Sequence, residues 1–130
     1  GLAARLAAKH ATAEEVQVLE QMIEDDRALV DDPSALARAN RRFHRQIHLA
    51  SHNRFLVRQL DLVHRSMALL TSSSLEVQGR RETALAEHDT IVAAMEARDG
   101  PAAEQALQQH ISRAFATRLK HDSARLDAAE

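Results

Sequence analysis

Histidine is the residue type whose positions in this sequence indicate chemistry. The chain has eight histidines in 130 residues, and His44, His88 and His110 fall where helical spacing predicts a buried face. His88, for example, belongs to a row with steps of three and four residues that also contains Leu85, Val92 and Met95. Asn40 precedes His44 by four residues, so a helix would present both side chains on one side.

Polar groups that meet inside an apolar bundle need partners, because burying one without a hydrogen bond costs about 1–3 kcal/mol. A divalent metal ion can bind several imidazoles at once, and neutral imidazole is the commonest metal ligand in proteins. A hydrogen-bonded core histidine is the alternative at each single position. Helical spacing alone leaves the metal site and the core histidines both open.

The other five histidines are expected at the surface or at helix ends, without a special role: His10, His48, His52, His64 and His121. His48 and His52 continue the row of Asn40 and His44 in steps of four residues. If a further histidine faces the interior, we therefore expect it to be one of these two.

Capping residues and helix breakers predict the six helices that would position these side chains. Thr12 and Glu15 form a capping box. Gly79 should break the chain before the fifth helix, and Gly100 should end that helix in the left-handed conformation, so that Pro101 begins the sixth. The expected segments run to about Lys9, from Thr12 to about Leu29, from Pro33 behind an Asp32 cap to about Ser51, from an Asn53 cap to a frayed end at Thr71–Ser74, from about Arg80 to Arg98, and from Pro101 along an apolar row of Ala103, Leu107, Ile111, Phe115 and Leu119.

Composition agrees with an all-α fold. Ala and Leu carry most of the apolar content, only 2% of residues are aromatic, and three Gly and two Pro are too few for the turns of a β-sandwich. Short links between amphipathic helices predict an antiparallel bundle of about six helices, with a central metal or effector site, in a single domain over residues 1–130. The chain has no cysteine, which excludes a thiolate metal site and a disulfide framework.

Charge and hydropathy argue against a nucleic-acid-binding, a membrane-spanning or a secreted protein. The formal net charge is −2 with both signs interspersed, so no basic face for nucleic acid stands out. No apolar run approaches the ~20 residues that span a membrane, and no signal peptide opens the chain. We therefore expect a cytoplasmic protein without a membrane partner. The chain begins in helical sequence without a cap, so we also expect it to be part of a longer protein.

Three stretches together resemble the FCD domain, the C-terminal effector-binding domain of the FadR subfamily of GntR transcription regulators. The first resembles the family's pattern of Asp or Asn, two variable residues and Phe-His, and the second its Glu-His with a downstream Asp before a turn. The third is similar to the helix after that turn, which ends its buried part in His-Ile. The stretches are Asn40–His44 with the following Ile47, Leu49–Ser51, Asn53 and Leu56; Glu87–Asp99; and Ala102–Ile111. The resemblance covers nearly the whole chain.

The resemblance implies a bundle whose centre holds a divalent metal, bound by one Asp or Asn and three His. Those positions correspond to Asn40, His44, His88 and His110, the four residues that helical spacing also selects. We expect zinc or nickel. The commoner first ligand in the family is Asp. The neutral Asn40 should weaken metal binding and leave the full charge of the cation, which favours an anionic ligand.

Family members sense small organic acids through a carboxylate on or near the metal, which implies the same class of effector here. A carboxylate also pairs well with a guanidinium. Arg81 lies two turns before His88, Arg113 lies one turn after His110, and Arg65 lies on the fourth helix; a solvated helix surface is the alternative for each. A winged helix-turn-helix domain on the N-terminal side, in a homodimer, would contact DNA, and the present chain would not.

The main alternative function is a metal-dependent helical-bundle enzyme with a three-histidine site. The Glu-x-x-His pairs of di-iron bundles and the His-Glu-x-x-His pattern of zinc proteases are both absent. No general base is evident near the predicted site, so we do not expect an enzyme. A phosphotransfer bundle, which needs an exposed histidine, and a structural module with satisfied core histidines are the remaining alternatives.

Overall fold

The computed structural model describes residues 1–67 and 74–129, and within those ranges it contains helices and no strand. The predicted all-α class and the six helices are confirmed. The expected frayed end of the fourth helix at Thr71–Ser74 lies almost entirely outside the described residues. The elements are α1 (Leu2–His10), α2 (Ala13–Arg27), α3 (Pro33–Ala50), α4 (Arg54–Met67), a short 3-10 turn η1 (Ser74–Glu76), α5 (Arg80–Glu96) and α6 (Gly100–Ala129).

The predicted helix starts form by local hydrogen bonding. Thr12 and Glu15 close the capping box in both directions, with donor–acceptor distances of 3.1 and 3.0 Å. Asp32 and Asn53 each accept a hydrogen bond from the backbone amide three residues later. Gly79 adopts φ +83° immediately before α5. Because these contacts are encoded within four residues, the sequence alone predicts them.

The boundary between α5 and α6 lies where predicted, but the prediction about its left-handed residue is wrong. Arg98 has φ 58°, whereas Gly100 is already the first residue of α6. The Arg98 guanidinium donates to two carbonyls at the end of α1, which holds the turn in place. Gly100 instead allows a close approach of α6 to α1, because a Cβ there would lie 3.3 Å from the backbone oxygen of Arg5, a tight contact.

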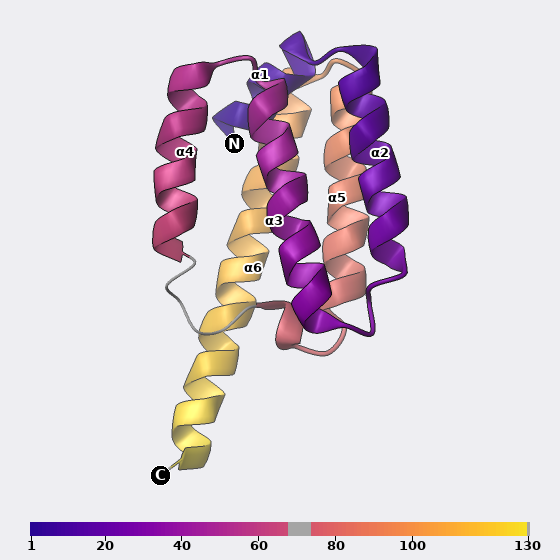
Figure 1. The fold of residues 1–130 in the computed structure, drawn as a ribbon. Coiled ribbons are helices and arrows are strands. Elements are labelled where there is room, and N and C mark those ends of the chain that lie inside the picture. The colour runs from indigo at the N-terminus through magenta and orange to yellow at the C-terminus, as the bar shows by residue number, and fades with distance from the viewer. Residues whose placement is uncertain (68–73, 130) are drawn as a thin grey trace.

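The core lies between α1, α2, α3, α5 and α6. Figure 1 shows α2, α3, α5 and α6 roughly side by side, with the short α1 at one end of them. Small side chains on α1 let this helix pack closely against α3, α5 and α6. The largest buried side chains of the core are Leu19, Ile23, Phe43, Ile47, Ile91 and Met95. No helix in the described part of the chain is long and apolar enough to cross a membrane.

The second half of α6 is more exposed than its apolar row predicts. Ile111, Phe115 and Leu119 continue the predicted apolar row, yet they are 47%, 53% and 52% exposed. Figure 1 shows that this part of α6 projects beyond the other helices. The apolar spacing is real, but among the described residues no helix covers this face.

Candidate metal centre

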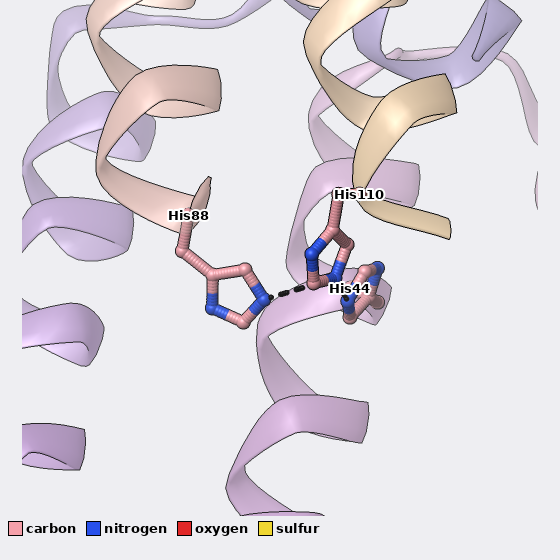
Figure 2. A group of neighbouring side chains, drawn as sticks. All are labelled: His44, His88 and His110. Atoms are coloured by element: carbon pink, nitrogen blue, oxygen red, sulfur yellow. Dashed lines mark hydrogen bonds between the residues drawn. The ribbon is translucent and has the colours of Figure 1, made fainter. Parts of the chain in front are cut away.

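The centre of the bundle contains three imidazoles, each from a different helix. His44 lies on α3, His88 on α5 and His110 on α6, and all three are buried. Figure 2 shows the three rings pointing toward one another. Each helix is placed by its own apolar face, so the helical spacing that buries those faces also brings the three side chains together.

The distances between the ring nitrogens suit a metal ion. His110 Nε2 lies 3.3 Å from His88 Nε2 and 3.2 Å from His44 Nε2. One ligand atom from each ring lies within 4.8 Å of the others. A tetrahedral zinc ion with bonds of 2.0–2.1 Å to imidazole spaces its nitrogen ligands about 3.3–3.4 Å apart. The three residues therefore fit a divalent metal.

The hydrogen bonding of the three rings is incomplete without a further partner. His110 Nδ1 lies 2.9 Å from the Glu87 carboxylate and donates to it, so Nε2 of the neutral ring carries a single lone pair. Both His44 and His88 approach that one lone pair. His88 Nδ1 is buried and has no partner among the described residues. A metal ion would accept one lone pair from each ring, so that His44 and His88 would no longer compete for the single lone pair of His110.

The environment keeps these imidazoles neutral, which is the form that binds metal. Burial lowers the pKa of His88 to about 3, with the neighbouring His110 as the next cause. Burial lowers the pKa of His44 well below its ordinary value, and His88 and His110 lower it further. Burial also lowers the pKa of His110, and this outweighs the opposite effect of Glu87.

Glu87 organises a buried ion-pair network beside His110. Its carboxylate accepts hydrogen bonds from His110 Nδ1, from Arg80 at 2.7 Å and from Arg113 at 2.9 Å. Burial alone would raise the pKa of Glu87, but Arg113, His110 and Arg80 together hold it below its ordinary value. Sequence reasoning missed the roles of Glu87 and Arg80. The only signal was that Glu87 belongs to the Glu-His pair of the resemblance.

A small cavity adjoins His88 on the side of α2 and α3. Asn40, half-buried on α3, lines it together with His88 and Asp26, and burial raises the pKa of Asp26. The cavity volume is about 10 Å³, enough for roughly one water. Asn40 thus lies beside the cluster, and Asp26 is a buried acid that sequence reasoning did not single out.

The three arginines expected to bind an effector lie in different surroundings. Arg81 lines the cavity, and its guanidinium donates to the carbonyls of Leu75 and Val30. Arg113 reaches the cluster through Glu87 while its side chain stays 58% exposed. Arg65 is exposed on α4 and is not among the residues that line the cavity.

One expectation about the remaining histidines is wrong. His48 is only 5% exposed, because its ring packs edge-on against His64 of α4. The step of four residues from His44 was the signal that could have placed it inside. His10 and His52 are exposed as expected, and His52 contacts the Glu15 carboxylate at 2.7 Å.

The fold and the site define a small helical-bundle domain built around a cluster of neutral imidazoles. The FCD domain family matches residues 1–113, and the chain belongs to that family. Among solved structures that match, E. coli McbR/YncC has a TM-score of 0.79 at 19% sequence identity, over 92% of this chain and 61% of that chain. At this identity the likeness shows the fold alone. Among curated proteins, none matches the chain.

Proposed function

We propose that this chain is the effector-sensing domain of a GntR/FadR-type transcription regulator, which binds a divalent metal and a small organic acid. His44, His88 and His110 would hold the metal, and Asn40 beside them would supply a fourth donor. The observation that carries the proposal is the convergence of three buried, neutral imidazoles at distances of 3.2 and 3.3 Å. Membership of the FCD family supports a regulatory role.

When bound, the metal, zinc or nickel in our proposal, supplies a cationic centre that attracts a carboxylate. The protein's contribution is to orient the ligands. Glu87 fixes the proton of His110 on Nδ1, so Nε2 faces the cluster. Phe43 stacks on His88, with ring centroids 4.1 Å apart and planes at 14°, and so restricts the rotation of that ring.

An organic acid needs more space than the observed cavity of about 10 Å³ provides. Arg81 connects this region to the α2–α3 link and to η1 through its hydrogen bonds to Val30 and Leu75. Effector binding would therefore require Arg81 to move, and the freed guanidinium could pair with the carboxylate. Such a rearrangement would change the contacts of two chain segments, which is what coupling to another domain requires.

The proposal includes a winged helix-turn-helix domain on the N-terminal side, a cytoplasmic location and a homodimer. The exposed apolar row on α6 gives a surface that a second copy could cover, because Phe115 and Leu119 are about half exposed. We propose a binding domain instead of an enzyme, since Glu87, the carboxylate that contacts the cluster among the described residues, is already bound by Arg80 and Arg113.

Elemental analysis of protein purified without a histidine tag tests the metal, and thermal shift with a series of small carboxylates tests the effector. We expect about one tightly bound zinc or nickel per chain, and stabilisation by some carboxylates only in the metal-loaded form. Protein that neither contains nor takes up a tight metal equivalent would refute the metal proposal. Carboxylates that stabilise the metal-free protein equally would refute their binding at the metal.

A further inference from the structure

The helices α3 and α4 concentrate positive charge that the net charge of the whole chain conceals. Residues 33–67 contain seven of the chain's 17 lysines and arginines, all seven arginine, and one of its 19 acidic residues, Asp61. Their formal charge is therefore +6, and that of the rest of the chain is −8. The two helices contact each other (Figure 1). The expectation that no basic face stands out holds for the whole chain but not for this pair of helices.

The seven arginines form two neighbouring rows. All are exposed, and their spacing of one or two helical turns places each set along one side of its helix. The rows meet where Arg45 of α3 donates a hydrogen bond of 2.6 Å to Asp61 of α4. Asp61 follows Arg58 by three residues and precedes Arg65 by four, so it lies in the arginine row of α4. The two rows together are called the basic surface here: Arg38, Arg41, Arg42, Arg45, Arg54, Arg58 and Arg65.

Acidic groups of the chain offset only part of this charge. Asp61 pairs with Arg45, and burial raises the pKa of Asp26 on α2, a rise that Arg42 opposes. Arg38 donates to the neutral hydroxyl of Ser34. Within residues 1–67 and 74–129 no ion pair involves Arg41, Arg54 or Arg58. These three arginines are therefore available to an anion.

We propose that the basic surface binds the phosphate backbone of duplex DNA without reading the base sequence. Surfaces that bind DNA are much more positively charged than surfaces that bind proteins. A guanidinium can donate two parallel hydrogen bonds to a phosphate, which suits a surface whose positive groups are all arginine. The proposed regulatory role places this chain beside a DNA-binding domain, and this selects DNA among polyanions. The surface itself is independent of the metal centre.

An acidic protein segment is the alternative partner, because two apolar side chains adjoin the basic surface. Phe55 and Leu62 on α4 are 65% and 64% exposed, and a protein partner could cover them. Along residues 38–45 of α3, in contrast, every exposed side chain is an arginine. A protein partner would find no apolar contact along this row, whereas phosphates need none. The row on α3 therefore favours DNA.

Contact with DNA through this surface would add to the contact that the proposed N-terminal domain makes. Two contacts from one molecule to the same DNA reinforce each other, because the second forms at a high effective concentration. The added contact would raise affinity for all sequences alike, since phosphates carry no sequence information.

Fluorescence anisotropy of a labelled short duplex of arbitrary sequence, titrated with the full chain, tests the surface. With about six phosphate contacts, wild-type affinity should fall about 10³-fold between about 50 mM and about 200 mM salt. The combined Arg41→Gln, Arg54→Gln and Arg58→Gln variant should bind more weakly. Its slope of log affinity against log salt should be smaller by about 3, because each lost phosphate contact removes about 1. Arg58→Gln alone should lower the slope by about 1.

The matched control combines Lys9→Gln, Lys120→Gln and Arg125→Gln, which are exposed positions outside the basic surface. It changes the net charge by the same amount and should keep the wild-type slope. No binding by wild type at about 50 mM salt, or an equal loss in the two triple variants, would overturn the proposal. An acidic peptide that binds wild type more tightly than a duplex of equal charge would overturn it in favour of a protein partner.

Circular dichroism checks that the variants fold, which we expect because every changed side chain is exposed. If the triple variant does not fold, Arg58→Gln alone decides. Absence of DNA binding would leave the proposed sensing role in place, since metal content and carboxylate binding test that role separately.

Discussion

His110 Nδ1 donates a hydrogen bond of 2.9 Å to Glu87 Oε1, and this contact determines which nitrogen of His110 faces the other two imidazoles. The two residues come from adjacent helices, α6 and α5, and both are buried. A carboxylate that accepts the outer N–H of a ligand histidine fixes its tautomer and its orientation. Glu87 is therefore a positioning residue for the proposed metal centre.

Glu87→Gln should weaken metal binding by about 10–100-fold, the usual effect of losing an outer-shell carboxylate. It should also lower stability, by up to about 3–5 kcal/mol, because Arg80 stays buried without its counter-charge. Competition with a chelator measures the affinity, and urea denaturation measures the stability. Glu82→Gln, an exposed change on the same helix, is the control. Equal metal affinities in the two variants would show that Glu87 does not position His110.

The sequence predicted the helices because their signals are local. The Thr12–Glu15 capping box operates within four residues, and the buried faces follow from a period of 3.6 residues. The same period placed His88 and His110 inside. It failed for Phe115, because periodicity reports an apolar face but not whether another helix covers it.

The contacts around the site could not be predicted, since they join residues far apart in sequence. Glu87 and Arg113 are 26 residues apart, and a charged residue on a helix is ordinarily read as solvated. The ion pair from Arg80 to Glu87 spans two turns of one helix and depends on the burial of both side chains. The sequence does not predict that His48 is buried, because the position of α4, whose His64 packs against it, is a tertiary property.

Zn²⁺ should stabilise the protein through the central histidines. At a free concentration about 100 times the Kd of the central site, the gain should be about 2.7 kcal/mol. His88→Gln should lose most of this gain, and exposed His10→Gln should keep it. Thermal or urea denaturation with and without Zn²⁺ measures the difference. A gain of the same size in His88→Gln would mean that the metal binds elsewhere.

The metal-free protein should lose stability as the pH falls below about 6.5, the ordinary pKa of histidine. Burial lowers the pKa of His48 to about 4 and that of His88 to about 3 in the folded chain. Between pH 6.5 and these pKa values the unfolded chain binds more protons than the folded chain. The free energy of unfolding is therefore highest above pH 6.5 and falls as the pH decreases through this range. Each such histidine contributes a slope of roughly 1.4 kcal/mol per pH unit.

Urea denaturation in the presence of a chelator, repeated from about pH 7 to about pH 5, measures this slope. His10→Gln should keep it, because His10 is exposed. His64→Gln should change it little compared with His88→Gln, since His88 is the more deeply buried. Constant stability over this range would contradict the neutral, buried state of the cluster.

Arg81→Ala should destabilise the protein even without an effector. The change removes the hydrogen bonds of 2.8 and 2.9 Å to the carbonyls of Leu75 and Val30. At about 0.5–1.5 kcal/mol each, their loss amounts to roughly 1–3 kcal/mol. Arg41→Ala, an exposed change on α3, is the control for urea denaturation. If the two variants are equally stable, the hydrogen bonds of Arg81 do not stabilise the segments that contain Leu75 and Val30. Effector binding would then not need to displace Arg81.

Asn40→Asp should tighten metal binding and weaken the binding of an anionic effector. A carboxylate cancels one unit of the cation's charge, and at ~4 Å with an effective dielectric of ~20 this is worth about 4 kcal/mol before desolvation. Desolvation of the new charge removes most of this, so we expect a net effect of ~1 kcal/mol, or about fivefold in affinity. Calorimetry with the metal, and then with a carboxylate series on the loaded protein, measures both effects. Asn40 lines the cavity next to His88, where a new charge would act on both partners. If neither affinity changes, Asn40 is not a ligand, and water would complete a three-histidine site.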